Sequence, residues 1–312
     1  MRRVSARPWI LLAFTVFSIS SAPKAHAQAW VPDVGDGTLA LSMQYTRVMK
    51  HLLSENVDQR VDPTSGYVLG PGNQAYYGDI IAMTNTISGE YVPLRRLAVS
   101  GEMAFIASRY DGRLPESPLD DGSYHADLQD MVLGARYMLP IRTLALTPSV
   151  DVRFPLTDYN RFGHVAAGTG LTSVSLGLNA GRSLDPIAPL VYVFLSYARV
   201  IVEDSDGYSL DGNHFACGAG MFFTRALSAQ GNFEYSDTMD GMDWQWANAD
   251  DIHRNVAARA LFRRVGLSAG YSLTHRLGLA MSWQSTISGA NVHATHSGAL
   301  GVSCGFWRKR PL

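Results

Sequence analysis

The chain has 312 residues, of which 46% are hydrophobic and 17% charged, and its 26 basic and 27 acidic residues leave a formal net charge of −1. Without a basic excess, nucleic acid is not an expected partner. Two cysteines are too few for a small domain stabilised by disulfides.

Residues 1–27 predict a secretory signal peptide. Three arginines precede an apolar run of 11 residues at 9–19, and Ala25-His26-Ala27 supplies a small-residue cleavage site before Gln28. A membrane anchor is the alternative, but a spanning helix needs roughly 20 apolar residues. Cleavage removes four basic residues and no acidic ones, which leaves 22 basic against 27 acidic residues.

Beyond residue 27, apolar and polar residues alternate with period two, which is typical of strands with two different faces. The alternation is clearest at 38–45, 97–107, 144–154 and 227–236. The predicted strands last about 9 to 14 residues, whereas strands of globular sheets commonly have about five or six. A tilted strand that crosses a membrane needs about 9 to 11 residues, so the lengths favour a membrane barrel.

Short corners near residues 95, 142, 186, 225 and 275 alternate with long segments rich in Asp, Gly, Pro and Asn. The long segments are 50–76, 111–124, 155–168, 203–213, 237–253 and a shorter one at 288–293. Five corners and six loops connect twelve strands. We therefore predict an all-β fold, a transmembrane antiparallel up-and-down β-barrel of about 12 strands, with both ends at the side of the short turns.

No linker divides the chain, so residues 28–312 are expected to form one outer-membrane β-barrel. The segment SGALGVSCGF resembles the C-terminal strand that the barrel assembly machinery of the bacterial outer membrane recognises. Its aromatic pair, Phe306 and Trp307, is followed by five further residues, which departs from that pattern. Cys217 and Cys304 are expected to face lipid as separate thiols.

Three segments carry a resemblance to a known family: VGDGTLALSMQY near the start of the barrel, DDGSYHADLQDMVLGARYML at 120–139, and PLTDYNRFGHVAAGTG at 155–170. They resemble the outer-membrane channels named after the meta-pathway of phenol degradation. The resemblance rests on spaced Gly, Asp and Tyr positions. It implies a barrel in the bacterial outer membrane that moves hydrophobic or aromatic small molecules inward, and it brings no catalytic residues.

If the apolar face of each strand meets lipid, the opposite face lines the lumen, because an arginine on the lipid side costs roughly 2–4 kcal/mol at the membrane midplane. The predicted lumen-lining residues are Glu102, Asp130, Arg136, Asp151, Arg153 and Glu234. Two interpretations stay open. The charges form either a constriction that filters solutes, or ion pairs that fill the closed interior of a structural or adhesive surface barrel.

A lipid-modifying outer-membrane enzyme is a third hypothesis, and it requires a serine within reach of a histidine. The adjacent pair is His296-Ser297, preceded by His293. Neighbours on a strand point to opposite faces, so we expect no catalytic residues. Both histidines are expected at the rim, in contact with headgroups or water.

Acidic clusters near 120–122, 204–207 and 250–251 are of a kind that coordinates calcium, but Asp-Gly pairs are also ordinary turn residues. We predict no metal and no other cofactor, although weak cation bridging to lipopolysaccharide stays open. The expected partners are outer-membrane lipid, lipopolysaccharide and a small-molecule solute. Trp244 and Trp246 lie in a long loop, where they could plug the barrel or contact a ligand; we favour ligand contact.

Overall fold

The computed structural model describes residues 29–57, 68–69, 72–112, 115–116, 118–245, 254 and 256–306. The predicted signal peptide, Trp246 and Trp307 lie outside the described residues.

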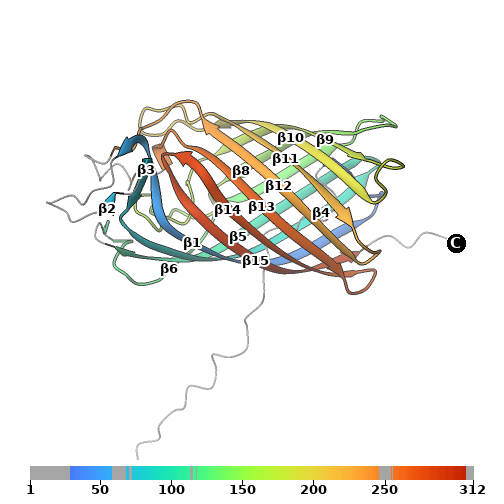
Figure 1. Cartoon of the computed structure of the whole chain (residues 1–312), viewed down its shortest axis with the longest axis horizontal. Helices are drawn as coiled ribbons and strands as arrows, with labels where there is room; N and C mark the ends of the chain where they lie inside the picture. The colour runs from blue at the N-terminus through green and yellow to red at the C-terminus, as the bar shows by residue number, and fades with distance from the viewer. Residues whose placement is uncertain are drawn as a thin grey trace, which may run out of the picture.

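Twelve antiparallel strands close into one barrel, as the alternation and turn spacing predicted (Figure 1). In barrel order they are β1 (Gly37–Val57), β4 (Gly78–Leu94), β5 (Leu97–Gly112), the interrupted strand formed by β6 (His125–Leu128) and β7 (Met131–Tyr137), β8 (Ala145–Phe154), β9 (Ser173–Ser183), β10 (Val191–Val202), β11 (Gly212–Phe222), β12 (Leu227–Thr238), β13 (Leu261–Ser272), β14 (Leu277–Ala290) and β15 (Val292–Phe306). Strands β6 and β7 count as one because both pair with β5.

Pairing between β1 and β15 closes the barrel, with Gly37 opposite Phe306. Both ends of the barrel therefore lie at the end that carries the short turns, as expected. We call this the short-turn end, and the opposite end the long-loop end. The described residues include no helix that is both long and apolar enough to cross a membrane.

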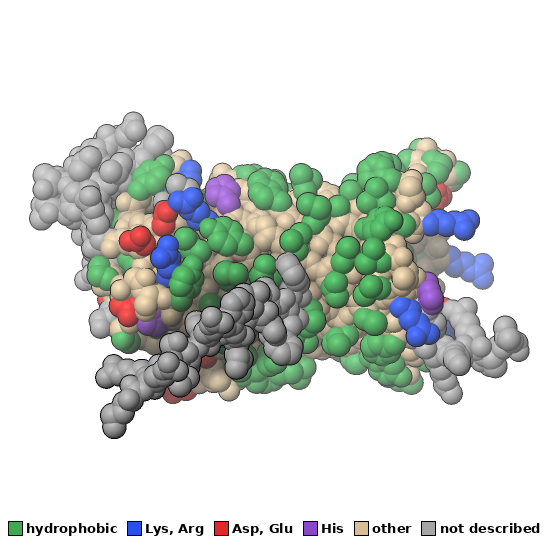
Figure 2. Space-filling view, turned by 90° about the horizontal axis from the view of Figure 1, so that it is seen from below, with side chains coloured by type: hydrophobic (Ala, Val, Ile, Leu, Met, Phe, Trp, Pro, Cys, Tyr) green, Lys and Arg blue, Asp and Glu red, His purple; other side chains and the backbone are tan. Residues whose placement is uncertain are grey.

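The two faces of the strands differ in chemistry, as the period-two pattern predicted. On β1, Leu39 and Tyr45 point outward and are exposed, whereas Ser42 points inward and is buried. Figure 2 shows hydrophobic side chains over the body of the barrel and charged side chains gathered toward its two ends. An apolar belt between two polar rims is the surface that a bilayer requires. Cys217 and Cys304 are free thiols on strand positions of the outward face.

Two short turns share a hydrogen-bonding threonine that explains a sequence repeat, TRALSA and THRLGLA. Thr224 Oγ1 accepts hydrogen bonds from the backbone N–H groups of Ala226 and Leu227, at 3.1 and 2.9 Å. Thr274 Oγ1 accepts the equivalent bonds from Arg276 and Leu277, at 3.1 and 3.0 Å. A side-chain oxygen that binds backbone N–H groups two and three residues ahead fixes a tight turn. The threonine, rather than the arginine beside it, therefore shapes these corners.

Two predicted loops are shorter than expected. The segment 50–76 was expected to be a loop, but β1 continues to Val57, and the two short strands β2 (Val68–Leu69) and β3 (Gly72–Tyr76) pair with each other. The segment 288–293 contracts to a turn at Asn291, which has a φ of 55° between β14 and β15. Asparagine tolerates this left-handed conformation better than most residues.

Candidate functional site: the barrel lumen

Charged side chains from four neighbouring strands meet on one side of the lumen. Arg136 of β7 donates a hydrogen bond from Nη2 to Glu90 Oε2 of β4 at 2.7 Å, and these side chains are 16% and 21% exposed. Glu102 of β5 and Asp151 of β8 face inward in the same region. We call Glu90, Glu102, Arg136 and Asp151 the charged belt. It holds three acidic groups and one basic group, and the neighbouring Arg153 leaves an excess of one negative charge, so the field of this region favours cations.

A glycine makes room for one member of the belt. Gly134 lies between Ser100 and Asp151 in the strand register. A Cβ atom at Gly134 would lie 2.3 Å from Asp151 Oδ1 and 2.6 Å from Ser100 Oγ. The carboxylate of Asp151 therefore lies over the backbone of β7, in space that a side chain at position 134 would fill.

Two inward-facing residues are exposed, which shows that water reaches part of the lumen. The register places Ser100 of β5 opposite Gly134, and Arg153 of β8 opposite Val132, on the same face as Glu102. Both residues are nevertheless exposed. Packed cores leave few voids larger than a water molecule, so side chains do not fill the interior at this level.

A second ion pair lies on another sector of the wall. Glu234 Oε2 of β12 is 3.7 Å from Arg264 Nη1 of β13, and Asn232 donates a hydrogen bond to Glu234 Oε1 at 3.0 Å. The side chains of Glu234 and Arg264 are 24% and 23% exposed. The lumen thus carries charges of both signs on separate strands.

Asp130 is buried at the junction of β6 and β7, where it anchors the connection between β8 and β9. It accepts hydrogen bonds from the hydroxyl of Tyr159 and from Thr169 Oγ1. The Tyr159 hydroxyl also accepts a bond from Gly170 N at 2.8 Å. Burial and the bond to Asp130 both raise the pKa of Tyr159, so the phenol stays protonated as the donor.

Aromatic rings and histidines fill the lumen at the long-loop end. We call His51, Tyr77, Tyr110, His164, Trp244 and His293 the cap cluster. His51 is completely buried, and its ring centroid lies 4.6 Å from that of His293 and 5.5 Å from that of His164. His164 stacks on Tyr110 with the ring centroids 3.9 Å apart. These contacts join three barrel strands, β1, β5 and β15, to the connection between β8 and β9.

A fully buried contact between Asp120 and His164 fixes this connection inside the barrel. His164 Nδ1 lies 2.8 Å from Asp120 Oδ2, and both side chains are 0% exposed. The same oxygen accepts backbone hydrogen bonds from His164 and Glu116, each at 3.1 Å. Burial alone would raise the pKa of Asp120, but the hydrogen bonds and the charge of His164 hold it below the ordinary value.

The expectation that His293 is a rim residue in contact with water or headgroups is wrong. Its ring packs against His51 and lies 5.5 Å from Trp244, centroid to centroid. The long strands β1 and β15 carry their inward faces beyond the charged belt, so a residue at the start of β15 still points into the lumen. Trp244 points inward, as expected for a residue that plugs the barrel. It is 1% exposed and packs with Leu53 and Tyr77.

His296 and Ser297 point to opposite faces, as strand alternation predicted. His296 is exposed and pairs through Nδ1 with Ser285 Oγ at 2.9 Å. Ser297 is buried on the inward face, 2.9 Å from Thr46 Oγ1. The two side chains therefore cannot act on each other as nucleophile and base.

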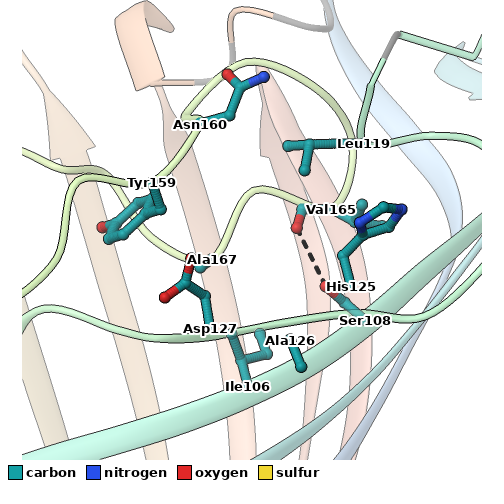
Figure 3. Close-up of a pocket in the computed structure, with 10 residues that line it drawn as sticks. All are labelled: Ile106, Ser108, Leu119, His125, Ala126, Asp127, Tyr159, Asn160, Val165 and Ala167. Atoms are coloured by element: carbon teal, nitrogen blue, oxygen red, sulfur yellow. Dashed lines mark hydrogen bonds between the residues drawn. The ribbon is translucent and has the colours of Figure 1, made fainter.

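A small cavity lies beside the cap cluster, between strands β5 and β6 and the β8–β9 connection (Figure 3). Its volume is about 120 Å³. Ile106, Leu119 and Val165 form apolar walls, and His125 and Asp127 add polar groups. Ser108 Oγ donates a hydrogen bond to Val165 O at 3.1 Å and closes one side.

The acidic loop clusters behave as turns where the structure describes them. Asp121 Oδ1 accepts bonds from Ser123 Oγ at 2.6 Å and lies 2.8 Å from His125 Nε2. These partners lower the pKa of Asp121. Within the described ranges, no three His, Cys, Asp or Glu side chains are placed to hold a metal ion.

Glu90 and Arg264 also face the lumen, although neither is among the predicted lumen-lining residues. The period-two pattern could have predicted both positions. Along β4, Glu90 lies on the face opposite to the outward residues Ile87, Gly89 and Tyr91. Along β13, Arg264 lies on the face opposite to Leu267, next to one irregular position in the register. The positions of His51 and His164 could not be predicted in this way. Both lie in segments that were expected to be loops, where no periodic pattern indicates which way a side chain points.

No protein-family model matches the sequence, and no curated protein matches it significantly. Solved structures do match the fold. The COG4313 outer membrane channel from Pseudomonas putida F1 has a TM-score of 0.66 at 13% identity, covering 90% of this chain and 99% of the channel. The NanC porin has a TM-score of 0.49 at 8% identity over 85% of this chain and 98% of the porin. The translocator domain of the autotransporter NalP from Neisseria meningitidis has a TM-score of 0.48 at 12% identity over 88% of this chain and 90% of that domain. At 13% identity, the first match shows that this chain shares the fold of an outer-membrane channel.

Proposed function

We propose that the protein is an outer-membrane channel for small solutes. The observation that carries this proposal is the exposure of the inward-facing residues Ser100 and Arg153 beside the charged belt. A wet, charged passage within an apolar outer wall would lower the cost of moving a polar solute through the membrane. The shared fold with an outer membrane channel supports the same function.

The orientation of the barrel in the outer membrane follows from the lengths of its connections. The short-turn end would face the periplasm and the long-loop end the exterior, because bacterial barrels have short periplasmic turns and long external loops. Residues 1–27 would be removed as the signal peptide during export. The barrel assembly machinery and lipopolysaccharide would then be partners on insertion and at the outer rim.

The cavity beside the cap cluster suggests which solutes enter. An engineered apolar cavity of about 150 Å³ in another protein holds benzene, and the present cavity is about 120 Å³. Apolar walls at Ile106 and Leu119, combined with His125 and Asp127, suit a small aromatic compound that carries a polar substituent. This solute class agrees with the family resemblance of the sequence.

Planar-bilayer recordings test the channel function. The purified protein should give stepwise currents with a preference for cations. Asp151→Asn should reduce this preference, measured as a reversal potential under a KCl gradient, because it removes a carboxylate from the charged belt. Asp204→Asn, which removes an exposed acid from the β10–β11 connection, is the matched control and should change the potential less.

A closed structural barrel is the second candidate, and the buried cap cluster favours it. If correctly folded protein, identified by heat-dependent gel mobility, gave no current and no solute uptake into liposomes, the closed barrel would replace the channel as the best account.

A further inference from the structure

A broad hollow lies on the apolar outer wall of the barrel, across strands β11 to β14. Its volume is about 740 Å³, within the roughly 300–1,000 Å³ of typical ligand pockets. The strand register places two rows of outward side chains across it, one of Met221, Ala229, Ala269 and Met281, and one of Ala219, Gly231, Leu267 and Trp283. We call this feature the outer hollow. It opens toward the bilayer, on the opposite face of the strands from the lumen.

The sizes of the side chains explain the outer hollow. Ala229, Gly231 and Ala269 leave its floor low, whereas Met281 and Trp283 rise from β14 and are 58% and 46% exposed. Packing within a membrane depends on van der Waals contact, because lipid tails are as apolar as the side chains. An unfilled hollow loses such contacts. A flexible hydrocarbon chain that lies on the floor, beside the tall side chains, restores them.

The outer hollow adjoins the short-turn end of the barrel. Met221 is the next-to-last residue of β11, and Ala229 is the third residue of β12. The turn that joins these two strands carries Arg225, and the turn that joins β13 to β14 carries His275 and Arg276. All three side chains are exposed, and neither turn contains an acidic residue. Basic groups therefore border the outer hollow at the membrane edge.

These turns hold their arginines in a fixed place. Thr224 and Thr274 each bind two backbone N–H groups of their own turn, which keeps the corner tight. A guanidinium group binds phosphate through two parallel N–H···O bonds. In the β9–β10 turn, Asp185 is bonded to Ser183 Oγ of the same turn. A lipid whose chain lies in the outer hollow would place its phosphate at this basic edge.

We propose that the outer hollow binds one anionic glycerophospholipid. An acyl chain lies on Ala229, Gly231 and Ala269, and the phosphate is held at Arg225 and Arg276. This inference goes beyond the proposed channel function and does not depend on whether the lumen conducts.

The charges favour a lipid over a second copy of the chain. In a two-fold dimer the same surface meets itself, and both copies have the short-turn end on the same side of the membrane. The basic turns of the two copies, with Arg225 and Arg276, would then lie beside each other and repel. A phosphate neutralises them instead.

Native mass spectrometry of the full-length mature protein in mild detergent measures the bound lipid. Titration with phosphatidylglycerol should give one tightly bound molecule, and phosphatidylcholine, which has no net charge, should bind more weakly. Arg225→Gln and Arg276→Gln should each weaken the binding of phosphatidylglycerol about fivefold, because each removes one positive charge from the membrane edge. Ala229→Leu and Ala269→Leu fill the floor with an apolar side chain and should abolish the tight binding.

Two matched controls separate the outer hollow from the rest of the wall. Ala135→Leu adds the same bulk on the outward face of β7, where Ala135 lies opposite the exposed Val99. Arg142→Gln removes an exposed arginine from the turn between β7 and β8. Neither should change the affinity for phosphatidylglycerol, and heat-dependent gel mobility confirms that every variant is folded.

The absence of tightly bound phosphatidylglycerol would overturn the proposal, as would equal affinities in Ala229→Leu and Ala135→Leu. Equal binding of the two lipids, together with unchanged affinity in both arginine variants, would show that no phosphate is recognised and would overturn it as well. A dimer in detergent that Ala229→Leu dissociates would identify a second copy as the occupant instead.

Discussion

At the scale of single residues, several charged side chains of the lumen have a charged partner or lie exposed to water. Arg136 pairs with Glu90, Glu234 lies near Arg264, and Arg153 is exposed. Asp151 can lie over the backbone of β7 because Gly134 has no side chain. Partial exposure keeps such pairs from bearing the full desolvation penalty of a buried ion pair.

The pair formed by Asp120 and His164 predicts that the cap loosens in acid. The folded-state pKa of Asp120 lies below its ordinary value of 3.8. Its contribution to stability is therefore complete above that ordinary value and is lost as the pH falls through the lower, folded-state pKa. The protection of the β8–β9 connection against hydrogen exchange, measured relative to the intrinsic exchange rate at each pH, should fall below about pH 4.

Asp120→Asn should already accelerate this exchange at pH 7. Leaving one partner of a buried hydrogen bond unsatisfied costs roughly 1–3 kcal/mol. Asp158→Asn, an exposed acid in the same connection, is the control. Exchange in Asp120→Asn that equals the unchanged protein at pH 7 would show that the pair does not hold the cap.

Alternation along a strand was sufficient to place Glu102, Arg136 and Asp151 on the inward face. It could not place His164 or Trp244, because their directions depend on loops that fold back through contacts with distant strands. The partner of His164, Asp120, is 44 residues away in the sequence, and nothing in the local pattern of either segment indicates the other.

At the scale of strands, close backbone approach fixes where glycine is required. A Cβ atom on Gly218 of β11 would lie 2.3 Å from the backbone oxygen of Gly231 on β12, and the ring of Phe194 closes the other side. A Cβ atom on Gly298 of β15 would meet nothing within 4 Å. The same substitution should therefore have different effects at the two positions.

Gly218→Ala should lower barrel stability by about 1–3 kcal/mol, the usual cost of overpacking, whereas Gly298→Ala should be close to neutral. Urea unfolding in lipid vesicles, followed by heat-dependent gel mobility, measures the difference. Equal midpoints for the two variants would contradict the close approach of β11 and β12.

Strand boundaries were predictable only where one face meets lipid. The lipid-facing parts of β5 and β8 show clear alternation, and the predicted ends of these strands lie near the observed ends. The part of β1 beyond residue 50 reads KHLLSENV, without alternation, and was taken for a loop. Where a strand rises past the membrane and water lies outside it, apolar residues are no longer needed on that face.

At the scale of the whole molecule, the spacing of turns was enough to predict twelve strands and the shared location of both barrel ends. A bilayer sets strand length, and an up-and-down barrel has one short and one long connection for each pair of strands. The cap cluster was not predictable, because it depends on contacts between residues that lie far apart in the sequence.

Passage of solutes through a wet lumen lined by the inward face of the strands is the main feature of the proposed channel. It is tested most directly by cysteine substitution along β8, one position at a time from 149 to 152, in a cysteine-free background and in planar bilayers. A cationic water-soluble thiol reagent should reduce the current through Ser149→Cys and Asp151→Cys, which face inward, and leave the current through Val150→Cys and Val152→Cys unchanged. Current through all four variants that is insensitive to the reagent, or block at positions 150 and 152 instead, would contradict the account.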